Sequence, residues 1–175
     1  MRKRSLGETQ MAIRGWMLGL CAALPMGAAS AATPPTRSPD MVLRIERGPC
    51  FGACPEYSVT VLGDGSVTFI GHRHVASMGV HKRQMAPADY ARLVKAVDGM
   101  DIYALDENYA VKATDQPTSY ITVIGPKGAK RIRHYGAGCG PEGGAAPGPD
   151  NAPPALCRFE RLLESLSGVS DWVGS

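Results

Sequence analysis

Two cysteines separated by three residues carry the most evident chemistry in this chain. They are Cys50 and Cys54, at the ends of the pentapeptide CFGAC. Disulfide oxidoreductases place a Cys-x-x-Cys pair at the start of a helix, where the helix dipole activates the thiol. Here the spacing is one residue longer, and Pro55 and a strand-like segment follow instead of a helix. We therefore expect a structural disulfide, and we keep thiol-redox activity as the alternative.

Three histidines follow, at His72, His74 and His81. A His-x-His pair on a strand would place two imidazoles on one side, and imidazole nitrogen is a common ligand of zinc and copper. No acidic residue or cysteine completes the set between residues 71 and 85. The histidines are therefore weak candidates for a metal site, and we expect a domain without a cofactor.

Catalytic signatures are missing from the sequence. The chain contains no Walker loop, nucleophile elbow, zincin helix or dinucleotide-binding fingerprint. Asp106 and Glu107 are adjacent in the chain rather than opposed across a cleft, so they do not suggest an acid–base pair. These observations favour a non-catalytic domain.

Cys139 and Cys157 bring the number of cysteines beyond the N-terminal segment to four. An even number in a small exported domain predicts disulfides, and four cysteines allow three pairings. We favour Cys50–Cys54 and Cys139–Cys157, the second of which would attach the Gly- and Pro-rich segment 136–154 to the last helix. A long-range bond from the first pair to Cys139 or Cys157 stays open.

The first 32 residues have the pattern of a signal peptide. Basic residues precede an apolar run at 16–29, and the run closes in small residues. The run is shorter than the roughly 20 apolar residues of a membrane-spanning helix. We expect a periplasmic or secreted protein with a Pro-rich leader at 33–40, a single domain at 41–175 and no transmembrane helix. Leu20 stands where a lipoprotein signal needs a small residue, so lipidation of Cys21 is not expected.

The formal charge of +3 originates in the predicted signal peptide. Residues 33–175 contain 15 Lys and Arg and 15 Asp and Glu, so this part is formally neutral. A neutral chain has no global field that attracts a polyanion, and we therefore expect no nucleic-acid partner. The basic residues from Lys127 to Arg133 fit the solvent side of a hairpin.

Apolar periodicity predicts the secondary structure. Alternating residues predict strands whose turns include Asp64-Gly65, with a further strand near Val75 or Val80. The predicted strands lie at 41–47, 57–61, 67–70, 120–124 and 131–133, and the predicted helices at 87–99 and 155–166. The order predicts an α+β fold, an antiparallel sheet built from hairpins with two amphipathic helices packed on one face.

The last predicted helix has an apolar stripe from Leu156 to Leu166. On this basis Glu160 and Glu164 are expected to face away from the sheet, and Cys157 is expected near the polar side, within reach of a loop.

The segment from Cys50 to Tyr57 resembles the C-F-G-x-C-P-x-Y signature of a bacterial exported family, domain of unknown function 6438. The likeness continues with Gly71, Gly79 and Trp172 and spans nearly all of the predicted mature chain. It implies an export or lipoprotein signal, and it supplies no activity, substrate or catalytic residue. The motif positions other than the cysteines are Phe51, Gly52, Pro55, Tyr57, Asp64, Gly65, Asp115 and Pro117.

These inferences combine into one functional hypothesis. We expect an exported, disulfide-stabilised, non-catalytic domain that binds a protein or small ligand in the cell envelope, or acts there as an accessory protein. The alternative is a thiol-redox or His-dependent metal-binding protein.

Overall fold

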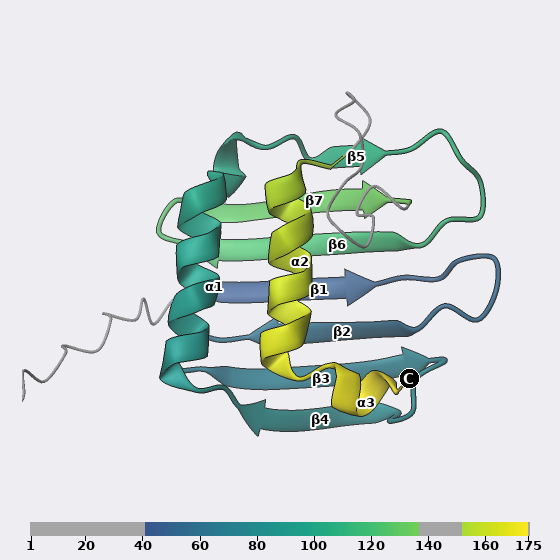
Figure 1. The fold of residues 1–175 in the computed structure, drawn as a ribbon, viewed down its shortest axis with the longest axis horizontal. Coiled ribbons are helices and arrows are strands. Elements are labelled where there is room, and N and C mark those ends of the chain that lie inside the picture. The colour runs from purple at the N-terminus through teal and green to yellow at the C-terminus, as the bar shows by residue number, and fades with distance from the viewer. Residues whose placement is uncertain (1–40, 137–151, 175) are drawn as a thin grey trace, which may run out of the picture. The chain divides into compact units, whose positions relative to one another are not determined.

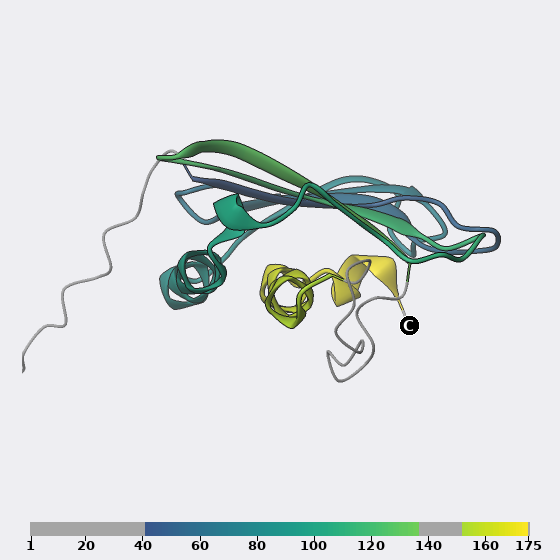
Figure 2. The same ribbon diagram turned by 90° about the horizontal axis from the view of Figure 1, so that it is seen from above.

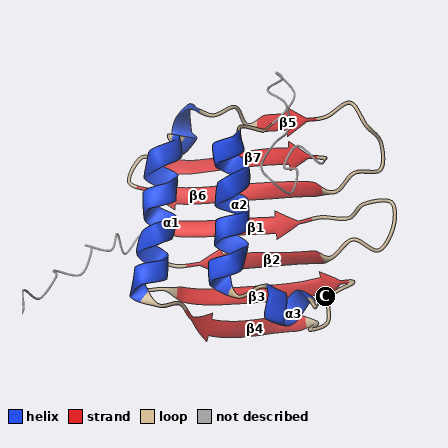
Figure 3. Cartoon of the chain, viewed as in Figure 1, coloured by secondary structure: helices blue, strands red, loops and turns tan. Residues whose placement is uncertain are grey.

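A computed structural model describes residues 41–136 and 152–174, which all belong to one compact unit. Figure 1 and Figure 3 show a sheet of antiparallel strands crossed by helices. The elements are β1 (Val42–Arg47), β2 (Glu56–Val61), β3 (Ser66–Arg73), β4 (Gly79–Gln84), α1 (Pro87–Met100), η1 (Ile102–Ala104), β5 (Asn108–Ala110), β6 (Thr118–Gly125), β7 (Gly128–Tyr135), α2 (Pro154–Ser167) and α3 (Ser170–Val173).

The strands form one sheet in the order β4-β3-β2-β1-β6-β7-β5. All neighbours are antiparallel except β5 and β7, which run parallel. Figure 2 shows α1 and α2 on the same side of this sheet, as expected for an α+β domain. Among the described residues, no helix combines the length and apolarity needed to span a membrane.

Side chains on the helix side of the sheet form rows that cross the strands. The central row is apolar: Phe69, Val59, Ile45, Ile121 and Ile132 are paired in register and fully buried. From α1 and α2, Tyr90, Leu93, Phe159 and Leu163 complete the core above this row. Strand alternation puts every second residue on this face, so the strand pattern in the sequence already selects the core.

The Asp64-Gly65 turn lies at the end of the sheet where β2 leads into β3. Gly65 has a φ of +83°, a conformation that glycine adopts without a steric penalty. The Asp64 carboxylate accepts a hydrogen bond from Ser66 N at 2.8 Å, and Met85 N donates to Gly65 O at 2.9 Å. The predicted hairpin is therefore present and also anchors the end of β4.

The C-terminal helix α3 packs on the β3–β4 hairpin. Trp172 stacks on Phe69 with ring centroids 5.1 Å apart, and the Arg83 guanidinium lies 4.7 Å from the Trp172 ring. Ser77 N donates to Trp172 O at 2.8 Å. Gly71 permits this arrangement, because a Cβ there would lie 2.2 Å from Ser77 O.

The strand expected near Val75 or Val80 is β4, which contains Val80. Two details differ from the sequence prediction. Helix α1 passes Gly99 and ends at Met100, because Met100 is itself buried and Asp101 adopts the left-handed conformation that ends the helix. β5 is a short parallel edge strand with too few residues to give a periodic pattern.

Candidate functional site

The cysteine loop stands at the end of the sheet opposite the Asp64-Gly65 turn. Cys50 and Cys54 form a disulfide with their Cα atoms 5.7 Å apart. Gly52 N donates to Cys50 O within the loop at 3.0 Å, and Phe51 N donates to Asp115 O at 3.3 Å. The loop is thus closed by a covalent bond and held to the segment before β6, although 86% of the Phe51 surface is exposed.

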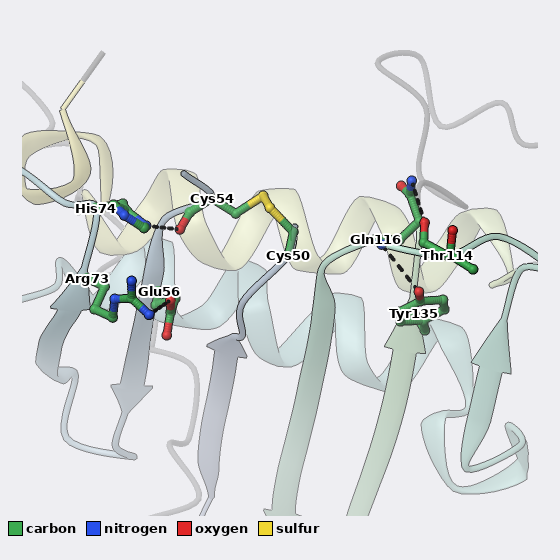
Figure 4. The surroundings of a disulfide bond; sticks show 8 residues. All are labelled: Cys50, Cys54, Glu56, Arg73, His74, Thr114, Gln116 and Tyr135. Carbon is green, nitrogen blue, oxygen red and sulfur yellow. Dashed lines mark hydrogen bonds and ion pairs between the residues drawn. A yellow bond between two sulfur atoms is a disulfide. The ribbon is translucent and has the colours of Figure 1, made fainter. Parts of the chain in front are cut away.

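Figure 4 shows the segments that flank this loop on its two sides. The His74 ring nitrogen Nδ1 lies 3.2 Å from Cys54 O, and Arg73 lies 3.5 Å from Glu56 at the start of β2. On the other side, Gln116 N donates to the Tyr135 hydroxyl at 3.2 Å. Two motifs that lie sixty residues apart in the sequence, the cysteine loop and Asp115-Gln116-Pro117, therefore meet at one end of the sheet.

A pocket of about 290 Å³ opens beside the loop. We call it the motif pocket, because family-motif residues supply half of its lining. The lining consists of Arg47, Gly48, Cys54, Pro55, Tyr57, Pro117, Glu164 and Val173. Pro55, Pro117 and Val173 contribute apolar walls, whereas Arg47 and Glu164 contribute charge.

Arg47 is the centre of the polar contacts next to the pocket. Its Nε and Nη2 donate to the two carboxylate oxygens of Glu164, at 2.7 and 2.9 Å. Its Nη1 donates to Glu160 Oε2 at 3.0 Å and also to Ser119 Oγ. Two parallel bonds between a guanidinium and a carboxylate fix geometry as well as charge.

Glu160 and Tyr57 extend these contacts across the sheet. Glu160 Oε1 lies 2.8 Å from Nδ1 of His134, and both side chains are buried. The Tyr57 hydroxyl donates to Glu164 Oε1 at 2.5 Å. We call this group the ion cluster: Arg47, Tyr57, Ser119, His134, Glu160 and Glu164.

The prediction that Glu160 and Glu164 face away from the sheet is wrong. Glu160 is 1% exposed, and both carboxylates point at β1. The buried face of α2 includes Leu156, Glu160, Leu163 and Ser167, which follow helical spacing and place Glu160 in the middle. Residue type alone suggested the opposite, because a carboxylate is normally solvated.

One signal in the sequence could have revealed this cluster. Leu43, Ile45 and Arg47 share one face of β1, and the first two belong to the core. A guanidinium on a core-facing position needs a buried carboxylate as its partner. A Glu pair four residues apart on the covering helix is the natural source of that partner.

The electrostatics of the cluster favour the protonated forms of Arg47 and Tyr57. Burial lowers the pKa of Arg47, but the hydrogen-bonded Glu164 carboxylate and the nearby Glu160 outweigh burial and raise it above its ordinary value. Burial raises the pKa of the Tyr57 phenol, and the charge of Glu164 raises it further. Tyr57 therefore keeps the proton that it donates to Glu164.

The remaining motif residues are split between two places. Phe51, Gly52, Pro55, Asp115 and Pro117 lie at the end of the sheet that carries the motif pocket. Asp64 and Gly65 lie at the opposite end and serve the β2–β3 turn. The octapeptide and the Asp-Gly pair thus have separate roles, although they are close in sequence.

The three candidate histidines do not share a face. His72 is on β3 on the side away from the helices, because Phe69 and Gly71 alternate onto the helix side. His81 pairs with Phe69 and stacks on Trp172 on the helix side. His74 has a φ of +52°, which breaks the strand alternation that would align it with His72. Within residues 41–136 and 152–174, no group of three or more His, Cys, Asp or Glu side chains is placed to hold a metal.

The second predicted disulfide involves Cys139, which lies outside the described residues. Cys157 is disulfide-bonded and fully buried on α2. The expectation that Cys157 lies near the polar side of the helix is therefore wrong. Its position about one turn before Glu160 explains this, since both residues belong to the buried face of α2.

A second cavity of about 460 Å³ lies near the opposite end of β1. Val94, Val97 and Ile102 give it apolar walls, and Asp98 and Lys127 give it charge. None of the family-motif residues lines it. For this reason we place the candidate functional site at the motif pocket.

Comparison with known proteins supports the family assignment. Residues 41–165 match the sequence profile of the family described as Domain of unknown function (DUF6438). No curated protein matches the chain closely enough to add an activity. The match includes the cysteine loop, the ion cluster and both glutamates of α2, and it covers well over half of the sequence. This chain therefore belongs to the DUF6438 family.

Proposed function

We propose that this protein is a binding domain whose motif pocket holds a neutral amide group attached to a small apolar side chain. One observation carries the proposal: two motifs that are distant in the sequence line the same pocket, and Arg47 and Glu164 supply the charged groups at its floor. Cys54, Pro55 and Tyr57 arrive from one motif and Pro117 from the other. Concave sites with apolar walls and a few fixed polar groups are typical of ligand recognition.

The polar groups of the floor favour an amide. A guanidinium has five N–H donors, and four of those on Arg47 are engaged by Glu164, Glu160 and Ser119. The fifth is on Nη2. Glu164 Oε1 accepts two hydrogen bonds and Oε2 accepts one from Nη2, which leaves acceptor capacity on Oε2. We infer that this donor and this acceptor serve the ligand, since Arg47 and Glu164 both line the pocket and an amide offers the complementary C=O and N–H.

Charge argues against an ionic ligand. One guanidinium stands beside two carboxylates in the cluster, so an anion would meet Glu164. A cation would meet the positive charge of Arg47, which the same carboxylates keep protonated. A neutral group avoids both penalties, because it does not have to desolvate a charge of its own.

The apolar walls define the rest of the ligand. A volume of about 290 Å³ is at the small end for ligand sites, so it suits one side chain rather than an extended molecule. Pro55, Pro117 and Val173 offer no hydrogen bonds from their side chains. The matching ligand is a peptide unit with a side chain such as that of leucine.

The test is a titration of the ¹⁵N-labelled protein with acetyl-leucinamide. We expect shifts of the amide signals of Gly48, Cys54 and Glu164 with a dissociation constant of about 1 mM, since a ligand of this size gains about 0.3 kcal/mol per heavy atom. Val173→Trp should fill the pocket and abolish the shifts. Val94→Trp fills the second cavity and is the matched control. Shifts that persist in Val173→Trp, or that are absent in the wild type, would refute the proposal.

We also propose that the domain functions after export. The N-terminal pattern of basic, apolar and small residues supports this, and so does the Cys50–Cys54 disulfide, since oxidising compartments preserve such bonds. Cell fractionation followed by mass spectrometry should recover a chain that begins near Ala32. A full-length, reduced chain in the cytosol would contradict export and leave the binding test unaffected.

A further inference from the structure

The side of the sheet away from the helices carries an ordered set of cations. Figure 2 shows α1, α2 and α3 all on the other side. Strand register places six side chains of this open side in one row across the sheet. We call it the cation–threonine row: Lys82, Thr68, Thr60, Arg44, Thr122 and Arg131.

The row has no carboxylate. Its cations lie on β4, β1 and β7, with threonines on the strands between them. Neighbouring strands are about 4.8 Å apart, so the row spans about 24 Å. Each threonine presents a hydroxyl that can donate and accept hydrogen bonds. The row is thus a straight strip of positive charge and hydroxyl groups.

The adjacent row adds charge of the same sign. Arg133 lies there next to Tyr120 and Glu46, and Glu46 is the one carboxylate of these two rows. Glu46 contacts Arg44 at 3.1 Å and Arg131 at 3.2 Å, so it holds both guanidinium groups in place. Four cations against one anion give these two rows a formal charge of +3, although residues 33–175 are formally neutral.

Two tyrosines also orient the guanidinium groups of Arg131 and Arg133. Arg131 lies 4.2 Å from the Tyr120 ring centroid, and Arg133 lies 5.1 Å from that of Tyr135. A stacked guanidinium keeps its N–H groups at the edge, where they can form paired hydrogen bonds with a carboxylate. The arginines are therefore organised for anionic groups and are not simply solvated charges on a hairpin.

We propose that this open side binds a linear polysaccharide that carries carboxylate groups. Charge complementarity selects an anionic polymer, and the alternation of cations with threonines selects one whose charges are separated by hydroxyl groups. A nucleic acid would gain less here, because single strands depend on stacking of bases on uncovered aromatic rings. The tyrosine rings of this face already carry Arg131 and Arg133.

The experiment is a binding titration of the full chain with polygalacturonate at low salt. We expect binding that weakens as salt rises, no binding of neutral dextran, and weaker binding of oligodeoxythymidylate. The double variant Lys82→Glu/Arg131→Glu should reduce the affinity for polygalacturonate by tenfold or more. Arg92→Glu/Lys95→Glu on α1 changes the net charge equally and should leave the affinity within twofold, because both residues are exposed on the helix side.

Several outcomes would overturn the proposal. They are an absence of polygalacturonate binding by the wild type, equal losses in the two double variants, and tighter binding of the oligonucleotide than of the glycan. The far-ultraviolet circular dichroism and melting temperature of each variant identify any loss of fold. A third variant, Arg44→Gln, keeps the hydrogen-bonding capacity toward Thr60 and should weaken binding by a few fold on its own.

Discussion

Two neighbouring rows on the helix side of the sheet differ sharply in chemistry. The central row, with Val59, Ile45 and Ile121, is apolar from β3 to β7, whereas the next row toward the cysteine loop contains Tyr57, Arg47 and Ser119. Both rows are covered by α2, and each strand moves from one row to the other in two residues. The first row is sufficient to form a core, since burial of each large side chain contributes about 1.5–3 kcal/mol.

The second row needs another explanation. A buried ion cluster is weak evidence for stability, because desolvation of the charges offsets their attraction. It does hold Arg47 and Glu164 rigidly at the floor of the motif pocket. The comparison suggests that the apolar row stabilises the fold and that the polar row shapes a binding site.

Arg47→Met should have the largest effect on stability. It leaves Glu160 and Glu164 without their common partner, and loss of one member of a buried charged group costs about 3–5 kcal/mol. Urea unfolding measures the change. The control Arg44→Met, on the open side, should cost about 0–1 kcal/mol, because its ion pair is part-exposed.

A combined variant sharpens that comparison. Arg47→Met/Glu160→Met/Glu164→Leu removes the charges together, and we expect it to be more stable than Arg47→Met, although Tyr57, Ser119 and His134 lose hydrogen-bond partners. The same variant should no longer bind acetyl-leucinamide. Retained binding would show that the polar row does not serve the pocket.

Ile121→Ala tests the apolar row and should cost about 3 kcal/mol, through lost transfer free energy and a new cavity. Because Ile121 belongs to the central row and does not line the motif pocket, the affinity for acetyl-leucinamide should stay within twofold. A large affinity loss, measured under conditions where the variant is folded, would contradict the division between the two rows.

Cys50→Ser/Cys54→Ser opens the loop and should cost about 2 kcal/mol, the chain-entropy value for a closed loop of five residues. We expect a larger loss of pocket affinity than in Ile121→Ala, since Cys54 lines the pocket. Peptide mapping of the wild type without reduction should recover Cys50 joined to Cys54. Alkylation of both thiols in the exported protein would instead support the redox alternative.

Tyr57→Phe should have the smallest effect, about 1 kcal/mol at neutral pH for one hydrogen bond to Glu164. Because the folded-state pKa of Tyr57 is raised, the stability from its proton is present below the ordinary phenol pKa of about 10 and falls as the pH rises above it. Between pH 7 and 11, the free energy of unfolding should therefore decrease less steeply for Tyr57→Phe than for the wild type. Tyr103→Phe, which removes a hydroxyl that donates to Gly128 O outside the cluster, is the control variant.

Much of the fold could be predicted from local patterns. Strand alternation at 57–61 identifies Tyr57, Val59 and Val61 as buried, and Asp64-Gly65 marks a turn that the structure contains. The signature around Cys50 identified the family, which the match over residues 41–165 confirms. These features depend on residues that are close together in the chain, so the sequence shows them directly.

The ion cluster could not be found in this way. Its arginine is on β1 and its glutamates are on α2, more than a hundred residues later. A helical pattern shows which residues share a face, but a carboxylate on that face was assigned to solvent by its type. Burial of these carboxylates depends on Arg47, which becomes their neighbour only because α2 packs over β1.

The sequence by itself determined every strand except β5, the two long helices and the family, and it favoured the disulfide loop, because each depends on spacing within a short segment. The tertiary structure alone decided that Asp115-Gln116-Pro117 meets the cysteine loop, that Arg47 meets Glu160 and Glu164, and that Lys82, Arg44 and Arg131 align. The physical reason is that charges and hydrogen-bonding groups act through space, and the sheet order β4-β3-β2-β1-β6-β7-β5 sets which of them become neighbours.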